Sequence, residues 1–80
     1  MFFTYILKSE KTGRLYKGHT KNLELRIEQH NSGKTKSTKH GIPWKLIYHE
    51  TFETRKEAIE RERFLKTGSG YRFIKSLNLF

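Results

Sequence analysis

The distribution of apolar and polar residues predicts a strand, a tight turn and a second strand at the start of the chain. Residues 2–8 are rich in aromatic and β-branched side chains, which favour a strand. Residues 10–13 end in a glycine, which readily adopts a positive φ angle, and therefore predict a turn. Residues 14–18 then return in the opposite direction, so we expect the chain to begin with a β-hairpin.

The next segment predicts a helix followed by a long polar loop. The helix is expected at about residues 22–31, with Asn22 as its N-terminal cap and Gly33 as the residue that ends it. Residues 32–43 contain several lysines and no acidic residue. Their polar composition is typical of a loop on the surface.

Residues 44–52 predict the third strand, because large apolar side chains alternate there with other side chains. A regular strand turns successive side chains to opposite faces of a sheet. The alternation therefore places one set of side chains on a single face: Trp44, Leu46, Tyr48 and Phe52.

Two helices are expected after the third strand. Thr54 and Glu57 have the spacing of a capping box, which predicts a helix from Thr54 to about Lys66. The segment 68–70 contains two glycines and predicts a break, after which residues 71–77 form a short final helix. The element order is then ββαβαα, and we expect an α+β fold with a small three-stranded antiparallel sheet flanked by helices.

Composition adds little to the fold but restricts the class of protein. Eighty residues suffice for one hydrophobic core, so we expect a single domain over residues 1–80. The chain has no cysteine, which excludes disulfides and thiolate-bound zinc. Its apolar start, residues 1–7, is too short to span a bilayer and has no preceding positive region. We therefore expect a cytoplasmic protein with no membrane segment.

A large excess of positive charge indicates a polyanionic partner. Seventeen Lys and Arg residues stand against eight acidic residues, which gives a formal charge of +9. A compact domain with this charge repels itself, and binding to a polyanion relieves the repulsion. Nucleic acid is the expected partner, and an anionic membrane surface is less favoured.

One glutamate lies where the second long helix is expected to be apolar. At about 100° per residue, Ala58, Glu62 and Leu65 share the face that packs on the sheet, whereas Glu60 points away from it. A buried carboxylate needs a compensating cation. That cation is either an arginine in a structural ion pair or a metal ion in a functional site.

The first helix carries the same anomaly with the opposite charge. Leu23 and Ile27 define its apolar stripe, and Arg26 and His30 flank that stripe four residues apart. In a purely structural interpretation, the stem of Arg26 packs while its guanidinium reaches solvent, and His30 is an ordinary helix histidine. In a functional interpretation, both side chains are directed at a site on the sheet.

Two tyrosines of the hairpin are expected to share one face of the sheet. Tyr5 and Tyr16 lie on adjacent antiparallel strands, and an even number of turn residues brings them to the same side. Half-buried tyrosines are also common in sheets without any functional role. Gly18, two residues after Tyr16, removes a side chain from that face and permits close approach of a ligand or another backbone.

In combination, these residues resemble the motifs of the GIY-YIG nuclease superfamily over nearly the whole chain. Its two tripeptides correspond to Phe3-Thr4-Tyr5 and Tyr16-Lys17-Gly18. The polar residues that follow in the family pattern correspond to Arg26, His30 and Glu62. Segments such as Asn31-Ser32-Gly33 resemble the small stand-alone branch more than the domains of UvrC-type repair enzymes or intron homing endonucleases.

The resemblance implies metal-dependent hydrolysis of phosphodiester bonds in DNA, with a connection to repair or recombination. Glu62 then holds a single Mg²⁺ or Mn²⁺ ion, and Arg26 binds the scissile phosphate. The base that activates water is either a tyrosine (Tyr5 or Tyr16) or His30. A tyrosine base needs a lowered pKa, which Arg26, Lys17 and the metal are expected to supply.

The remaining surface is expected to bind the DNA backbone rather than read bases. The residues expected to contact nucleic acid are Lys17, Gly18, His19, Lys34, Lys36 and Lys39. Two alternatives to an active nuclease are a binding module of the same fold that has lost turnover and a basic RNA-associated protein.

Overall fold

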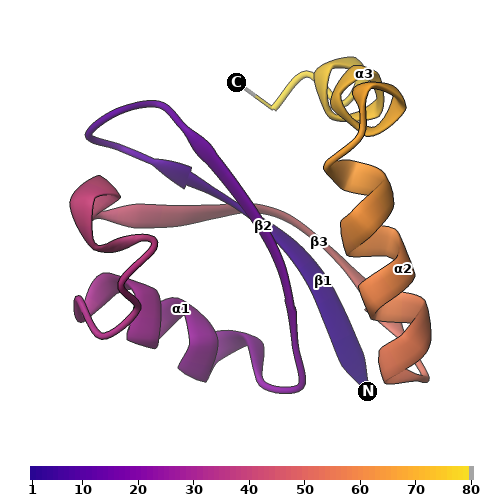
Figure 1. The fold of residues 1–80 in the computed structure, drawn as a ribbon, viewed down its shortest axis with the longest axis horizontal. Helices are drawn as coiled ribbons and strands as arrows, with labels where there is room; N and C mark the ends of the chain where they lie inside the picture. Colours follow the sequence, from indigo (N-terminus) through magenta and orange to yellow (C-terminus); the bar gives the residue numbers. More distant parts are fainter. Residues whose placement is uncertain (80) are drawn as a thin grey trace.

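Local sequence signals and the observed elements agree closely. The computed structural model describes residues 1–79, and its elements in chain order are β1 (Phe2–Ser9), β2 (Leu15–Thr20), α1 (Leu23–Asn31), η1 (Lys39–Gly41), β3 (Trp44–Phe52), α2 (Arg55–Leu65) and α3 (Gly68–Ser76). The strands form one antiparallel sheet in the order β2-β1-β3 (Figure 1). The predicted α+β architecture and the order ββαβαα are confirmed, and the short 3-10 helix η1 inside the polar loop is an addition.

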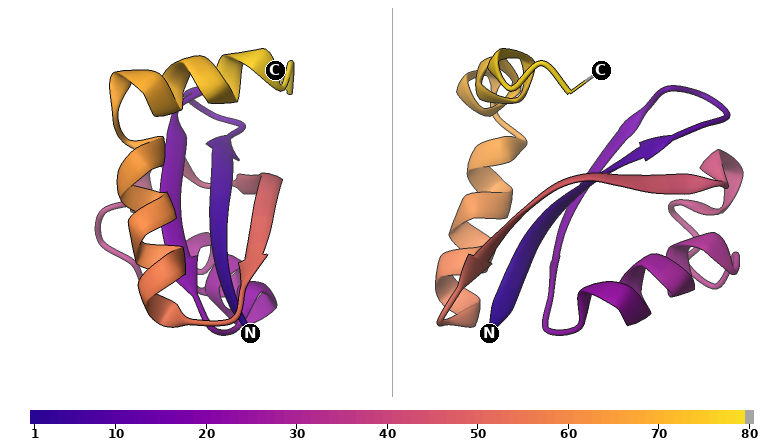
Figure 2. Two further views of the ribbon diagram at one scale, coloured as in Figure 1. Left: turned by 90° about the vertical axis from the view of Figure 1, so that its right-hand side faces the viewer. Right: turned by 180° about the vertical axis from the view of Figure 1, so that it is seen from behind.

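The sheet separates two layers of helices. Helix α1 packs on one face of the sheet, and α2 with α3 covers the other, as the views in Figure 2 show. The central strand β1 contributes side chains to both hydrophobic cores, because its side chains alternate between the two faces of the sheet. Tyr5 and Leu7 are buried on the α1 face, whereas Ile6 is buried with Leu65 and Ile74 on the α2 face.

Turn and cap residues act as their sequence positions predict. Gly13 has a φ angle of 78° in the hairpin turn. The side chain of Asn22 accepts a hydrogen bond from the backbone N–H of Leu25 and caps α1. Thr54 and Glu57 form both hydrogen bonds of the capping box at the start of α2. These short-range interactions fix where the helices that carry the site begin.

The prediction that Trp44, Leu46, Tyr48 and Phe52 share one face of the sheet is wrong. A bulge between the pairs Ile6–Tyr48 and Leu7–Leu46 leaves Ile47 without a partner on β1. One extra residue moves every later side chain to the other face. Leu46 therefore packs on the α1 face, whereas Tyr48 packs on the α2 face against Ile6.

The chain does break before the final helix, but the predicted position of the break is wrong, because α2 ends at Leu65 and α3 begins at Gly68. The segment 68–70 forms the first turn of α3, and the side chain of Thr67 caps that helix by accepting from the N–H of Gly70. A Cβ atom on Gly70 would lie 2.0 Å from the carbonyl oxygen of Phe64. The glycine therefore serves the close contact between α2 and α3 rather than a helix break. Within residues 1–79, no helix has the length and apolar character needed to cross a membrane.

Candidate active site

The edge strand β2 distributes its functional residues between the two faces of the sheet. Tyr16 and Gly18 pair with Leu7 and Tyr5 of β1 and therefore face α1. His19 pairs with Thr4, and its ring is bonded to a side chain of α2. The predicted residues thus form two groups on opposite sides of one strand.

Tyr5, Tyr16 and His30 form an aromatic cluster on the α1 face. The Tyr5 and Tyr16 rings have centroids 6.3 Å apart, and the Tyr16 and His30 rings 4.8 Å apart. The Tyr5 hydroxyl lies 3.0 Å from Nε2 of His30. The expectation that both tyrosines share a face is confirmed, and His30 is fully buried between them and α1.

Gly18 allows the Tyr5 ring to lie against β2. A Cβ atom on Gly18 would lie 2.6 Å from the Tyr5 hydroxyl oxygen and 3.1 Å from a ring carbon of Tyr16. No side chain fits in this space, so glycine is needed for the tyrosines to reach their positions. The close approach that the sequence predicts at Gly18 is thus made by Tyr5, and contact of Gly18 with nucleic acid stays a prediction.

Thr38 orients the buried histidine. Its Oγ1 lies 2.8 Å from Nδ1 of His30 and donates to the carbonyl of Thr35. Since the Thr38 hydroxyl donates elsewhere, its oxygen accepts a hydrogen bond from the N–H at Nδ1 of His30. Nε2 of His30 is then the acceptor for the Tyr5 hydroxyl. A chain of hydrogen bonds runs from Tyr5 through His30 to the polar loop.

On this face, burial has a larger effect on the pKa values of His30 and Tyr5 than the charge of Arg26 has. Burial, and secondarily the positive charge of Arg26, lowers the pKa of His30 to about 4. Burial also raises the pKa of Tyr5 to about 12, although a hydrogen bond and the charge of Arg26 act in the opposite direction. At neutral pH both groups are therefore uncharged. As far as the protein's own cations determine it, the expected lowering of the tyrosine pKa is wrong for Tyr5, because desolvation of a phenolate outweighs the effect of Arg26.

Glu62 lies on the α2 face within a charged cluster. His19 donates from Nδ1 to Oε1 of Glu62 at 2.6 Å, and Lys66 donates from Nζ to Oε2 at 2.7 Å. Burial alone raises the pKa of Glu62, but the hydrogen bonds from Lys66 and His19 outweigh it, so the pKa lies below its ordinary value. The carboxylate is ionised at neutral pH. Its partners are a histidine and a lysine, not the arginine of the structural alternative.

The two groups meet at the edge strand. The negative charge of Glu62 contributes to the raised pKa of Tyr5, after the larger effects of burial, Arg26 and Tyr16. Arg26 is half-buried on α1 and donates to the side chain of Gln29 at 3.0 Å. The lysines expected to contact DNA are divided as well, with Lys17 half-buried on β2 and three exposed on the polar loop: Lys34, Lys36 and Lys39.

The donor set of Glu62 fits one hard divalent cation with a largely aqueous shell. Within residues 1–79, no three His or Glu side chains gather closely enough to hold a metal by themselves. Glu62 offers an ionised carboxylate whose Oε2 is bonded only to the flexible, exposed Lys66. Mg²⁺ is commonly bound by one carboxylate, several waters and substrate oxygens. Glu62 would hold the ion, and Lys66 would release Oε2 to it.

Two residues of the site escaped the sequence reasoning. Thr38 lies in a polar loop without periodicity, and no local pattern marks its hydroxyl as a partner of His30. Lys66 stands four residues after Glu62, a spacing at which side chains on a helix meet. That spacing is a signal that the sequence does contain.

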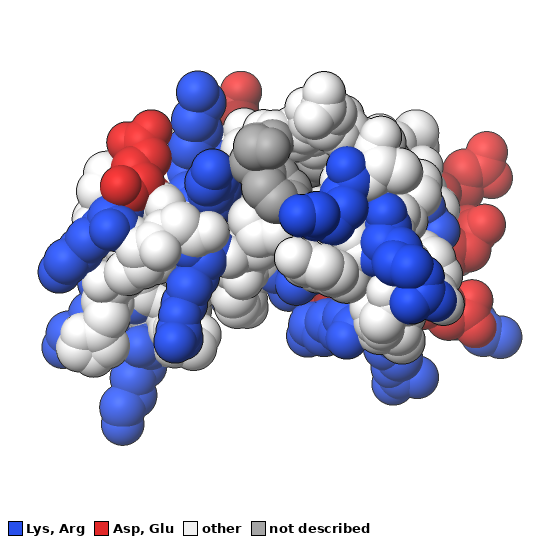
Figure 3. All heavy atoms as spheres, turned by 90° about the horizontal axis from the view of Figure 1, so that it is seen from above, with Lys and Arg blue, Asp and Glu red and all other residues white. Residues whose placement is uncertain are grey.

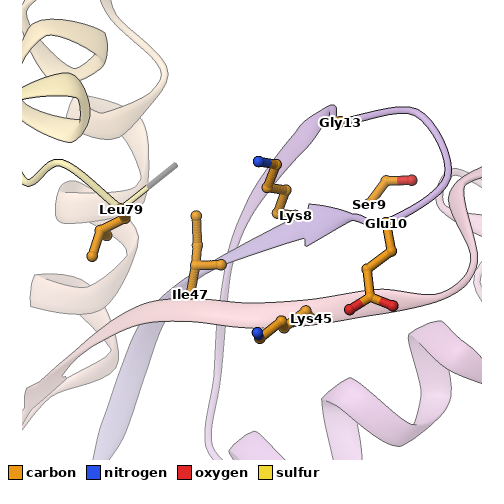
Figure 4. Close-up of a pocket in the computed structure, with 7 residues that line it drawn as sticks. All are labelled: Lys8, Ser9, Glu10, Gly13, Lys45, Ile47 and Leu79. Atoms are coloured by element: carbon orange, nitrogen blue, oxygen red, sulfur yellow. The ribbon is translucent and has the colours of Figure 1, made fainter.

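Basic side chains are spread over the surface, and of the two cavities described here only one is lined by a predicted site residue. In Figure 3, Lys and Arg side chains project from both sides of the visible face, and acidic side chains lie toward its margins. A cavity of about 490 Å³ lies at the far end of the sheet, between Lys8, Lys45 and Leu79 (Figure 4). It contains none of the predicted site residues. A groove of about 540 Å³, by contrast, is lined by Tyr16.

Comparison with known proteins agrees with this geometry. The sequence profile of the GIY-YIG catalytic domain matches residues 1–73. A UPF0213 protein of Staphylococcus saprophyticus is 42% identical over 77 residues, which cover 95% of this chain and 93% of that protein. A UPF0213 protein of Staphylococcus aureus is 44% identical over 66 residues, covering 81% of this chain and 79% of its own length.

A solved structure shares the fold. The solution NMR structure of a UPF0213 protein from Bacillus halodurans aligns with a TM-score of 0.58 and 30% sequence identity. The alignment covers 99% of this chain and 87% of that one.

Proposed function

We propose, from the premise that the chain belongs to the GIY-YIG catalytic domain family, that it is a divalent-metal-dependent endonuclease acting on DNA. The observation that carries the proposal is the arrangement around β2. An ionised carboxylate lies on one side of this edge strand, and a neutral tyrosine–histidine pair lies on the other. Hydrolysis of a phosphodiester needs a cation for the phosphate and an acceptor for the proton of water.

On the α1 face, the chain provides a path for that proton. The Tyr5 hydroxyl donates to Nε2 of His30, so Tyr5 passes its proton to His30 as it takes one from the attacking water. This path avoids a free tyrosinate, which the raised pKa of Tyr5 disfavours. Tyr16 packs against both rings and holds the alignment, and His30 is the final acceptor. Burial lowers the pKa of His30 to about 4, so the negative charge of a phosphate bound beside Arg26 has to favour the protonated ring.

Arg26 provides the cation for the phosphate on this face. Its guanidinium donates to Gln29 and lies near enough to Tyr5 to act on the pKa of that hydroxyl, and its other donors can bind a phosphate oxygen. Since the guanidinium lies beside Tyr5, a phosphate bound there is next to the proton path. Binding and proton transfer are thus adjacent.

On the α2 face, Glu62 holds the metal ion and His19 holds Glu62. A bound Mg²⁺ or Mn²⁺ ion supplies charge neutralisation for the phosphate and the leaving oxygen. The hydrogen bond from His19 fixes one carboxylate oxygen and leaves the other for the ion. With a single carboxylate ligand, we expect one ion per site.

DNA binding in this proposal is directed at the backbone, with a steep dependence on salt. The net charge of +9 and the exposed lysines of the polar loop support it. A cytoplasmic location and a role in repair or recombination are part of the proposal, since DNA is the substrate.

The experiment that tests the proposal compares DNA cleavage by the wild type with cleavage by Glu62→Gln. Plasmid nicking and cutting of branched DNA are measured with Mg²⁺ or Mn²⁺. We expect the variant to lose about a thousandfold in rate, because it lacks the charged ligand, while DNA binding persists. Glu60→Gln is the matched control, since Glu60 is an exposed carboxylate on the same helix.

Three results would contradict the proposal. If the wild type binds DNA and cuts none of the substrates with either metal, the chain is a binding module of this fold. If RNA binds far more tightly than DNA, the assignment of DNA as the substrate is wrong. Equal rates for the wild type and Glu62→Gln would remove the metal ligand from the mechanism.

A further inference from the structure

A groove next to Tyr16 has no role in the steps above. It measures about 540 Å³ and lies between the hairpin turn and the polar loop. The hairpin contributes Arg14 and Tyr16, and the loop region contributes His40 and Trp44. We name it the hairpin groove. Its size falls within the range of sites for small ligands.

The loop wall of the hairpin groove is fixed in place. The indole N–H of Trp44 donates to the carbonyl of Thr38 at 2.7 Å, and the ring lies against Gly41, where a Cβ atom would come within 2.4 Å of it. The side-chain amide of Asn31 bonds both the N–H and the carbonyl of Trp44. The groove is therefore preorganised rather than formed by chance between mobile loops.

The chemistry of the walls is that of a nucleotide site. The half-buried Tyr16 supplies most of the aromatic surface, since Trp44 is only 8% exposed, and the two ring centroids are 6.3 Å apart. Arg14 and His40 are exposed basic side chains, and hydroxyl groups come from Thr12 and Ser37. No acidic residue lines the groove. Aromatic surface with a cationic rim suits a nucleobase and its phosphate.

We propose that the hairpin groove receives one unpaired nucleotide of the DNA strand that is cut. The inference rests on the proposed nuclease function for the identity of its ligand. Tyr16 belongs to both the groove and the aromatic cluster, so a nucleotide held there is adjacent to the proton path from Tyr5 to His30. A base in a paired duplex is stacked and cannot enter, so the groove selects forked or single-stranded DNA.

The test uses Trp44, the only tryptophan of the chain, as a fluorescent reporter. Glu62→Gln protein is titrated with forked DNA, with a fully paired duplex of equal length, and with forked DNA lacking bases in its unpaired arm. We expect the forked DNA to bind about tenfold more tightly than the duplex. It should also change the Trp44 emission, and the base-free arm should lose both effects.

Substitutions on the rim distinguish binding in the groove from general electrostatic attraction of DNA to the basic surface. Arg14→Ala and His40→Ala should each reduce the preference for forked DNA several-fold. Lys11→Ala is the matched control, because Lys11 is an exposed cation in the same turn that does not line the groove. It should weaken binding to both DNAs equally. Each substituted residue is exposed, so folding is expected to be unaffected.

Equal affinity for forked and paired DNA, or tight binding of forked DNA without a change in Trp44 emission, would overturn the inference. The result is independent of catalysis, since the variant used does not cut. If forked DNA binds as expected but the wild type cuts nothing, the inference that the groove binds a nucleotide is supported and the proposed nuclease function is wrong. If the wild type cuts paired and forked DNA at equal rates and the Trp44 emission does not change, the nuclease function is supported and the inference about the groove is wrong.

Discussion

On the α1 face of the sheet, Tyr5, His30 and Thr38 are buried, uncharged and joined by hydrogen bonds, whereas on the α2 face the charged Glu62 is partly exposed. His30 is fully buried between Tyr5 and Thr38. The side chain of Glu62 is 17% exposed and accepts hydrogen bonds from His19 and from the exposed Lys66. The two groups are separated only by the strand β2.

This difference matches two different tasks. Proton transfer needs fixed donors and acceptors, and burial fixes them because an unsatisfied polar group in the core is costly. Metal binding needs a carboxylate that stays ionised and can exchange partners, which requires access to water. In the part of the chain that the structure describes, every buried side-chain nitrogen and oxygen has a hydrogen-bond partner. The alternation of side chains along one edge strand is enough to supply both environments.

The largest effect that separates the two faces should be on stability at acid pH. The pKa of His30 is lowered from 6.5 to about 4 in the folded state, so the unfolded state binds more protons between these values. The contribution of His30 to the free energy of unfolding is therefore present in full above pH 6.5. It is lost as the pH falls toward 4, and the loss amounts to about 3 kcal/mol. Urea denaturation across this range measures the loss.

The contrast with Glu62 makes this measurement specific. Its pKa lies below the ordinary 4.5, so its contribution to stability is lost only at lower pH. His30→Gln should therefore remove most of the fall between pH 6.5 and 4, and Glu62→Gln should leave it in place. A fall that persists unchanged in His30→Gln would show that another group causes it.

The fold was predictable to the extent that short-range rules determine it. The hairpin turn at Gly13, the Asn22 cap and the capping box at Thr54 all depend on contacts within a few residues, and all are confirmed. The bulge at Ile47 and the helical role of Gly70 depend on partners distant in sequence. A strand pattern and a glycine carry no local signal of such partners, so both predictions failed.

The candidate site shows the same limit. Helical phase singled out Glu62 and Arg26, because a charge on an apolar face is visible in the sequence. Thr38 was not visible, since its role depends on the loop returning to His30 across the face of α1. The pKa of Tyr5 was predicted in the wrong direction, because the sequence shows nearby cations but not the extent of burial.

A smaller effect should appear when the substitution of Thr38 interrupts the chain of hydrogen bonds from Tyr5 through His30. Thr38→Val keeps the shape of the side chain but removes the acceptor for Nδ1 of His30. We expect cleavage to slow about tenfold, which corresponds to about 1.4 kcal/mol for one hydrogen bond. Thr38→Ser keeps the hydroxyl and loses the methyl group, so it should restore most of the rate. If Ser is as slow as Val, then Thr38 acts by packing rather than through its hydroxyl.

The smallest effect should follow from removing the exposed partner on the α2 face. Lys66 and Glu62 form an i,i+4 pair in which Lys66 is 54% exposed, and such pairs contribute about 0.3–0.5 kcal/mol. Lys66→Ala should therefore change thermal stability only slightly. Because Lys66 occupies the oxygen that the ion would take, the variant should reach half-maximal cleavage at a lower Mg²⁺ concentration than the wild type. A higher Mg²⁺ requirement in Lys66→Ala would mean that Lys66 assists the bound state, and the two faces would then differ less in their ability to exchange partners.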